Sequence, residues 1–134
     1  MSDIAFLFPG QGSQAAGMGK LLSDTYAVAR RTFEEADDAL GFSISRVCFE
    51  GSDEELKQTE ITQPALLAVS TAAARVLAEQ GLSADMVAGH SLGEYSALVA
   101  ANALDFADAL RLVRMRGQLC KRLCPLVLVP WLQF

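Results

Sequence analysis

A five-residue motif, GHSLG at residues 89–93, places a serine where it could act as a nucleophile. The motif follows a short apolar run at residues 85–88 and precedes a helical pattern over residues 94–101. In this strand-turn-helix setting, Gly89 and Gly93 permit a tight turn that lifts the hydroxyl of Ser91 clear of a sheet. The N–H of Leu92, at the start of the helix, then points toward developing negative charge. We therefore predict Ser91 as the nucleophile and Leu92 as an oxyanion donor.

A serine nucleophile needs a base, and the sequence has a single histidine, His90. Adjacent side chains at a sharp turn point in different directions. We therefore expect His90 to support the turn beside Gly89 and Gly93 rather than to accept the Ser91 proton. Three alternatives remain for the base: it is absent, it is a group other than histidine, or it is encoded beyond residue 134.

A second loop, GQGSQ at residues 10–14, follows the apolar run at residues 4–8. If residues 4–8 and 85–88 form neighbouring parallel strands, both loops leave the same carboxyl edge of the sheet, where α/β proteins bind ligands. The flanking glycines would let the N–H of Gln11 approach an acyl oxygen and complete an oxyanion hole with Leu92. The alternative is a flexible glycine turn. A phosphate loop is not expected, because the G-K-[ST] ending is missing.

Five basic residues lie between residues 111 and 122, on or just after a predicted helix. An arginine turned inward would bind a carboxylate through two parallel hydrogen bonds. The pattern alone does not select among Arg111, Arg114, Arg116 and Arg122. The other basic residues are expected on a solvated helix face.

The predicted elements alternate between strands and helices. We expect strands at residues 4–8 and 85–88, and between them a helix that is capped by Ser23 or Asp24 and ends at Leu40 with Gly41 as its C-cap. A capping box at Ser52 is expected to open a short helix, and a longer helix is expected from about Thr62 to Gln80 with Pro64 in its first turn. A last helix follows Asp105 and reaches at least Arg116. This order, with no hairpin signal, predicts an α/β fold with a parallel sheet flanked by helices.

Composition narrows the class of protein. The 134 residues are 51% apolar and 20% charged, which is typical of a soluble globular domain, and the net charge of −5 argues against a nucleic-acid partner. We expect no membrane span or signal peptide, because no apolar run reaches about 18 residues and the N-terminus lacks a basic region. Three cysteines, an odd number, favour a cytoplasmic location. No metal site is expected, because Cys120 and Cys124 have no second ligand pair.

Four segments together resemble the malonyl-CoA:acyl carrier protein transacylases of bacterial type II fatty acid synthesis. They are FPGQGSQ at 8–14, TQPA at 62–65, GHSLGEYSA at 89–97 and RMRG at 114–117, and the resemblance covers residues 1 to about 118. It implies that Ser91 is acylated by malonyl-CoA and passes malonyl to the phosphopantetheine thiol of acyl carrier protein, with no permanently bound cofactor. It also implies that Gln11 and Leu92 supply oxyanion N–H groups, that Arg116 binds the malonyl carboxylate, and that Gln63 lines the site.

The resemblance also implies an architecture. Residues 1–118 would be the N-terminal part of a hydrolase-like acyltransferase large subdomain, into which family members insert a ferredoxin-like small subdomain. The family's catalytic histidine and a further glutamine would lie beyond residue 134. Two other readings stay open: a serine hydrolase or acyltransferase with another acyl-CoA specificity, and an inactive, poorly soluble fragment that lacks its base.

Residues 119–134 depart from the family pattern. Residues 109–134 hold five basic residues and no acidic one, whereas all 16 acidic residues precede them. Residues 119–134 can be encoded by a DNA sequence whose reading frame from the third base encodes MQEAVPVGTGAMAAI. This peptide is similar to the family's sequence after this helix. We therefore predict that residues 119–134 are a frameshifted reading. Otherwise the basic patch of Arg111, Arg114, Lys121 and Arg122 would suit an acidic acyl carrier protein.

Overall fold

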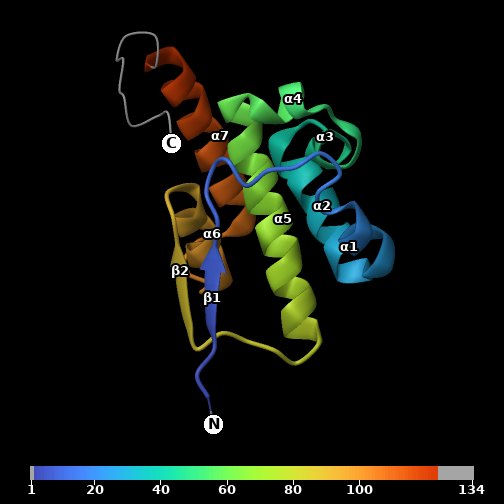
Figure 1. Ribbon diagram of the computed structural model, residues 1–134, viewed down its shortest axis with the longest axis vertical. Helices are drawn as coiled ribbons and strands as arrows, with labels where there is room; N and C mark the ends of the chain where they lie inside the picture. Colours follow the sequence, from blue (N-terminus) through green and yellow to red (C-terminus); the bar gives the residue numbers. More distant parts are fainter. Residues whose placement is uncertain (1, 124–134) are drawn as a thin grey trace.

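The computed structural model of the protein describes residues 2–123. In chain order, the elements of this part are β1 (Ala5–Phe8), α1 (Lys20–Thr25), α2 (Ala27–Leu40), α3 (Ile44–Glu50), α4 (Asp53–Lys57), α5 (Thr59–Glu79), β2 (Met86–Gly89), α6 (Leu92–Ala100) and α7 (Phe106–Leu123). Figure 1 shows how these elements are arranged.

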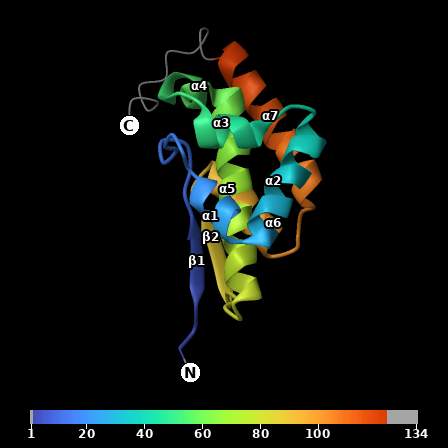
Figure 2. The same cartoon turned by 90° about the vertical axis from the view of Figure 1, so that its right-hand side faces the viewer.

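The two strands pair in parallel, with Ala5 opposite Met86 and Phe8 opposite Gly89. Helices α1 to α5 form the long crossover that a parallel pair requires. Figure 2 shows α2, α5, α6 and α7 to one side of the strands. The predicted α/β fold with a parallel sheet is confirmed. Both strands end at one carboxyl edge, which leads into the loop at residues 9–14 and into the GHSLG motif.

Helix α5 is the centre of the fold and packs against α2, α6 and α7. Its buried positions are mostly small or aliphatic, so neighbouring helices approach it closely. The fully buried large side chains around it include Phe33, Ile44, Leu56, Leu67, Leu92, Leu110 and Val113. By length and mean hydropathy (1.3) α5 would be able to cross a membrane, a test that core helices of soluble proteins also meet, and 56% of that window is buried.

The predicted helix from Ser23 or Asp24 to Leu40 is wrong at its start. The structure has two helices there, because Tyr26 is extended (φ −121°, ψ 125°) and interrupts them. Ser23 is buried inside α1 and caps nothing, whereas Tyr26 packs against the core. The end of the helix is confirmed: Gly41 has φ 75° and donates its N–H to the Asp37 carbonyl over 2.9 Å.

Helix α5 begins at Thr59, three residues before the predicted start, so Pro64 lies in the second turn rather than the first. The first turn is held by local bonds that the sequence pattern did not reveal. The N–H groups of Ile61 and Thr62 both donate to the Gln58 carbonyl over 2.8 Å, and the Thr62 hydroxyl donates to the Gln58 and Leu56 carbonyls. Proline at position 64 has no N–H to donate within the helix. The hydrogen bonds of Ile61 and Thr62 stabilise the first turn and offset this loss.

Helices α3, α4 and α7 have side-chain caps at their N-termini. Ser52 accepts from the Glu55 N–H over 3.2 Å and Asp105 accepts from the Asp108 N–H over 3.1 Å, as predicted. Helix α3 was not predicted. Its cap combines Ser43 with a side chain from another helix, since Asp37 accepts from both the N–H and the hydroxyl of Ser45. Of the predicted frameshifted segment, residues 119–123 continue α7, and residues 124–134 lie outside the described part.

Candidate active site

The GHSLG motif forms the turn between β2 and α6. Ser91 is the N-cap of α6 and has φ 53° and ψ −108°, a strained conformation for a residue with a side chain. The two glycines leave no room for anything larger: a Cβ on Gly89 would lie 2.0 Å from the Gly93 carbonyl carbon, and one on Gly93 would lie 2.1 Å from the Phe8 carbonyl oxygen. Ser91 is exposed, and Leu92 begins the helix with an N–H that has no partner in the preceding turn.

The loop at residues 9–14 touches this turn. The His90 N–H donates to the Phe8 carbonyl over 3.2 Å, and a Cβ on Gly10 would lie 2.6 Å from the His90 carbonyl oxygen. The loop is held by its own serine, because the hydroxyl of Ser13 donates to the Gly10 carbonyl over 2.8 Å. Gln11 is exposed, and its side-chain amide donates to the Thr59 hydroxyl over 3.2 Å. The two loops therefore meet at the carboxyl edge, and Gln11 lies beside the start of α5.

Arg116 is the arginine that reaches Ser91, the predicted nucleophile. Its Nη2 donates to Ser91 Oγ over 3.0 Å and its Nη1 donates to Gln63 Oε1 over 3.4 Å. Gln63 is only 3% exposed, so the amide that receives the guanidinium is held inside the fold. The guanidinium carbon also lies 5.3 Å from the centre of the Tyr95 ring. Residues from α5, α6 and α7 thus converge on Ser91.

The other arginines of α7 do not reach the serine. Arg114 lies 4.3 Å above the Phe42 ring and donates to the Leu40 carbonyl, and Arg111 binds Asp108 and the Ala39 carbonyl. Both therefore point toward the end of α2, and Arg122 is exposed. The sequence left four candidates for an inward arginine, and the structure brings Arg116 to the serine.

Close helix packing sets the position of Arg116. A Cβ on Gly117 would lie 2.7 Å from both the Thr59 carbonyl oxygen and Glu60 Cα, so α7 touches the backbone of α5 at this point. One turn further along, Lys121 Nζ donates to Glu60 Oε1 over 2.7 Å, and this hydrogen bond lowers the pKa of Glu60. Sequence reasoning did not identify Thr59 or Glu60. Gly117 entered only as the last residue of the RMRG segment, with no role assigned.

Within residues 2–123, the hydrogen bond to Ser91 Oγ comes from Arg116, which cannot act as a base. His90 is exposed, and its carbonyl accepts the Gly93 N–H while its Nδ1 lies on the Gly10 side. No cluster of three or more metal-ligating side chains occurs in the described part of the chain. The described part of the site therefore brings together a serine hydroxyl at the start of α6, a buried amide and a guanidinium.

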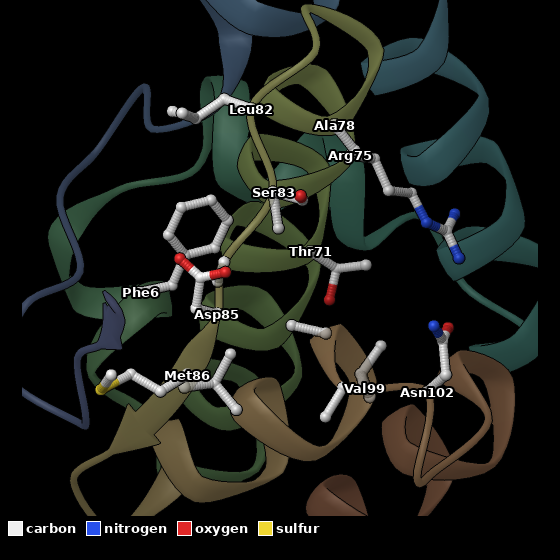
Figure 3. A pocket seen from close by; sticks show the side chains of 15 residues that line it. Phe6, Thr71, Arg75, Ala78, Leu82, Ser83, Asp85, Met86, Val99 and Asn102 are labelled. Carbon is white, nitrogen blue, oxygen red and sulfur yellow. The ribbon is translucent and has the colours of Figure 1, made fainter. Parts of the chain in front are cut away.

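A separate cavity of about 580 Å³ lies at the other end of the strands, as Figure 3 shows. Its lining includes Phe6, Thr71, Arg75, Asp85, Met86 and Asn102, and none of the predicted site residues. Arg75 is already bound to Glu35 over 2.8 Å, and Asp85 accepts the Ile4 N–H over 2.8 Å. The two main charged groups of this cavity therefore have partners within the protein.

Comparison with known proteins places this geometry in a family. The sequence model of the family described as acyl transferase domain matches residues 5–126. The chain belongs to the acyl transferase domain family. This acyl transferase domain is 54% identical, over 93% of its length, to the malonyl CoA-acyl carrier protein transacylase of Bacillus subtilis strain 168, and 51% identical, also over 93%, to that of Escherichia coli K12.

Solved structures agree with the domain in both sequence and fold. An acyl carrier protein S-malonyltransferase from Vibrio cholerae gives a TM-score of 0.86 at 51% identity, over 90% of this chain and 40% of that one. A malonyl-transacylase in complex with a type II polyketide acyl carrier protein gives 0.86 at 49% identity, with the same coverage. The chain spans about 40% of the length of the curated relatives that it matches.

Proposed function

We propose that this acyl transferase domain belongs to an enzyme that transfers malonyl from malonyl-CoA to the phosphopantetheine thiol of acyl carrier protein. The observation that carries the proposal is the 3.0 Å contact between Arg116 Nη2 and Ser91 Oγ. In malonyl-CoA the free carboxylate is one methylene from the thioester carbonyl. A cation beside the nucleophile therefore matches the place that the carboxylate takes when Ser91 attacks.

The proposed reaction has two half-reactions. In the first, Ser91 Oγ attacks the thioester carbonyl carbon and gives its proton to a base; the carbon–sulfur bond then breaks, and coenzyme A takes a proton and leaves as a thiol. In the second, the phosphopantetheine thiol gives its proton to the base and attacks the carbonyl carbon of the malonyl-serine ester; the carbon–oxygen bond to Ser91 then breaks, and Ser91 Oγ takes the proton from the base. The N–H groups of Gln11 and Leu92 stabilise the oxyanion in both steps. The base comes from the part of the fold beyond the segment shared with the relatives.

Selectivity follows from the same contact. The guanidinium of Arg116, which Gln63 holds, binds the free carboxylate when malonyl enters the site. When acetyl enters, the guanidinium has no anionic partner, because acetyl lacks this carboxylate. A serine hydrolase for neutral esters has no use for this cation.

The proposal includes a cytoplasmic location, which the free thiols of Cys48 and Cys120 favour. The names of the relatives support acyl carrier protein as the acceptor of the malonyl group.

The test measures acyl preference in an extended chain, in which residues 1–118 are followed by the remainder of the Bacillus subtilis relative. Arg116→Ala should reduce transfer of malonyl relative to acetyl by about 10- to 100-fold, because the carboxylate loses a charged hydrogen-bond partner. Arg111→Ala, which removes a positive charge elsewhere on α7, is the matched control and should leave the ratio unchanged. Equal losses for both acyl groups in Arg116→Ala would rule out the carboxylate role.

A further inference from the structure

The loop at residues 9–14, which we call the glycine loop, is tied to α5 by one side chain. Gln11 lies between Gly10 and Gly12, and Gly12 has φ 113°, a conformation that residues with side chains rarely adopt. Glycines on both sides let the peptide groups of Gln11 rotate unless another contact fixes them. That contact is made at the first residue of α5, where Gln11 Nε2 donates to Thr59 Oγ1 over 3.2 Å. Figure 1 shows the chain passing α5 between β1 and α1.

Among the described residues, the other hydrogen bonds of the glycine loop begin and end within it. The Ser13 hydroxyl donates to the Gly10 carbonyl over 2.8 Å, and the Gly12 N–H donates to the side-chain oxygen of Gln14 over 2.7 Å. These bonds fix the shape of the loop and would move with it. The bond to Thr59 differs, because its acceptor belongs to the central helix of the fold. It therefore sets where the glycine loop lies relative to α5.

Thr59 also contacts the helix that carries Arg116. A Cβ on Gly117 would lie 2.7 Å from the Thr59 carbonyl oxygen, so the backbone of Thr59 touches α7 at the residue after Arg116. Arg116 in turn donates to Ser91 Oγ. The hydroxyl of Thr59 thus binds the glycine loop, while its carbonyl lies against α7. One residue at the start of α5 therefore contacts both the loop of the proposed oxyanion donor and the helix of the proposed carboxylate ligand.

We propose that Thr59 is a positioning residue whose hydroxyl, by holding the Gln11 side chain, keeps the Gln11 N–H directed at the thioester oxygen. This inference rests on the proposed function, in which that N–H stabilises the oxyanion. The oxyanion forms on the carbonyl that malonyl and acetyl share, whereas Arg116 binds the carboxylate that acetyl lacks. Loss of the Thr59 hydroxyl should therefore slow transfer of both acyl groups alike, unlike loss of the Arg116 guanidinium.

Backbone dynamics in the 134-residue chain test the tether without any reaction. Thr59→Val removes the hydroxyl and keeps the branched shape of the side chain, Thr59→Ser keeps the hydroxyl, and Thr25→Val at the exposed end of α1 is the matched control. In Thr59→Val, the NMR order parameter of the Gln11 amide should fall from about 0.85, typical of rigid backbone, toward about 0.6. Thr59→Ser and Thr25→Val should leave it unchanged. An unchanged order parameter in Thr59→Val would overturn the proposal.

A double-mutant cycle in the extended chain tests the role in the reaction. Thr59→Val should lower kcat by about three- to tenfold with malonyl-CoA and acetyl-CoA alike and leave KM nearly unchanged, and Thr59→Ser should restore most of the loss. Gln11→Leu removes the other partner of the same bond but keeps the backbone N–H, so it should lower kcat by a similar factor. The two changes together should cost no more than either alone, because both remove one hydrogen bond.

The outcomes separate this proposal from the proposed function. Losses that multiply in the double variant would show that Thr59 and Gln11 act separately, which contradicts the proposal. A loss confined to malonyl would also contradict it, since Thr59 would then serve recognition of the carboxylate. An extended chain that transfers no malonyl before any substitution would refute the proposed function instead, and the order parameters would still decide whether Thr59 holds Gln11.

Discussion

At the scale of single residues, the central contact joins the Arg116 guanidinium to the hydroxyl of Ser91. Arg116 donates to Ser91 Oγ and to the buried amide oxygen of Gln63. Under the proposed function Ser91 is the nucleophile, and the malonyl carboxylate takes the guanidinium and releases the hydroxyl for attack. One arginine would thus position the serine hydroxyl and select the acyl group.

Gln63 should act through this arginine. We expect Gln63→Leu to raise the KM for malonyl-CoA in the extended chain by about two- to tenfold, because one hydrogen bond to the guanidinium is lost. The kcat and the KM for acetyl-CoA should change little. Steady-state kinetics with both substrates checks this, and Gln118→Leu, an exposed amide on α7, is the control. A kcat loss with both substrates would show that Gln63 does more than hold Arg116.

Some residues of the candidate site could be predicted from the sequence, and others could not. Ser91 and its flanking glycines were accessible because a tight turn is a local structure with local residue requirements. Arg116 was one of four arginine candidates by pattern, because the rotation and depth of α7 depend on packing against α5. Gln63 entered through family resemblance, since a buried polar residue in a helix has no signature of its own. Thr59 and Glu60 were missed because the predicted start of α5, at about Thr62, left them outside the helix.

At the scale of elements, the contact between α5 and α7 positions Arg116. We expect Gly117→Ala to destabilise the protein by about 1–3 kcal/mol, because its Cβ would meet backbone atoms of α5 that cannot move aside. Urea unfolding measures this loss, and Gln118→Ala, one residue further along, should be nearly neutral. In the extended chain, Gly117→Ala should also lower the preference for malonyl. Unchanged stability and preference would show that α7 has room to move here.

Element boundaries show where local patterns fail. Strand positions and the glycine end of α2 were predicted, because apolar runs and a C-cap are local signals. The break at Tyr26 was not, since that side chain leaves the helical pattern to pack on the core. The start of α5 was misplaced because hydroxyl and carbonyl bonds around Thr62 outweigh the usual place for a proline.

At the scale of the whole molecule, the basic C-terminal stretch contrasts with an otherwise acidic chain. We propose that residues 119–134 are a frameshifted reading. Lys121, which binds Glu60, and Arg122 would then be absent from the original protein, and the basic patch would shrink to Arg111 and Arg114. Sequencing the coding DNA past the Gln118 codon should show a shifted frame that continues into a segment with a histidine. An intact frame through residue 134 would refute this.

The proposed malonyl transfer depends on Ser91 carrying the malonyl group. The most direct measurement is peptide mass mapping of the extended chain after brief exposure to malonyl-CoA without acyl carrier protein. We predict one malonyl adduct, on the peptide that contains Ser91, which disappears when acyl carrier protein is added and does not form in Ser91→Ala. Ser83→Ala, a serine in the loop before β2, should keep the adduct. An adduct that persists in Ser91→Ala, or that maps to another residue, would contradict the account.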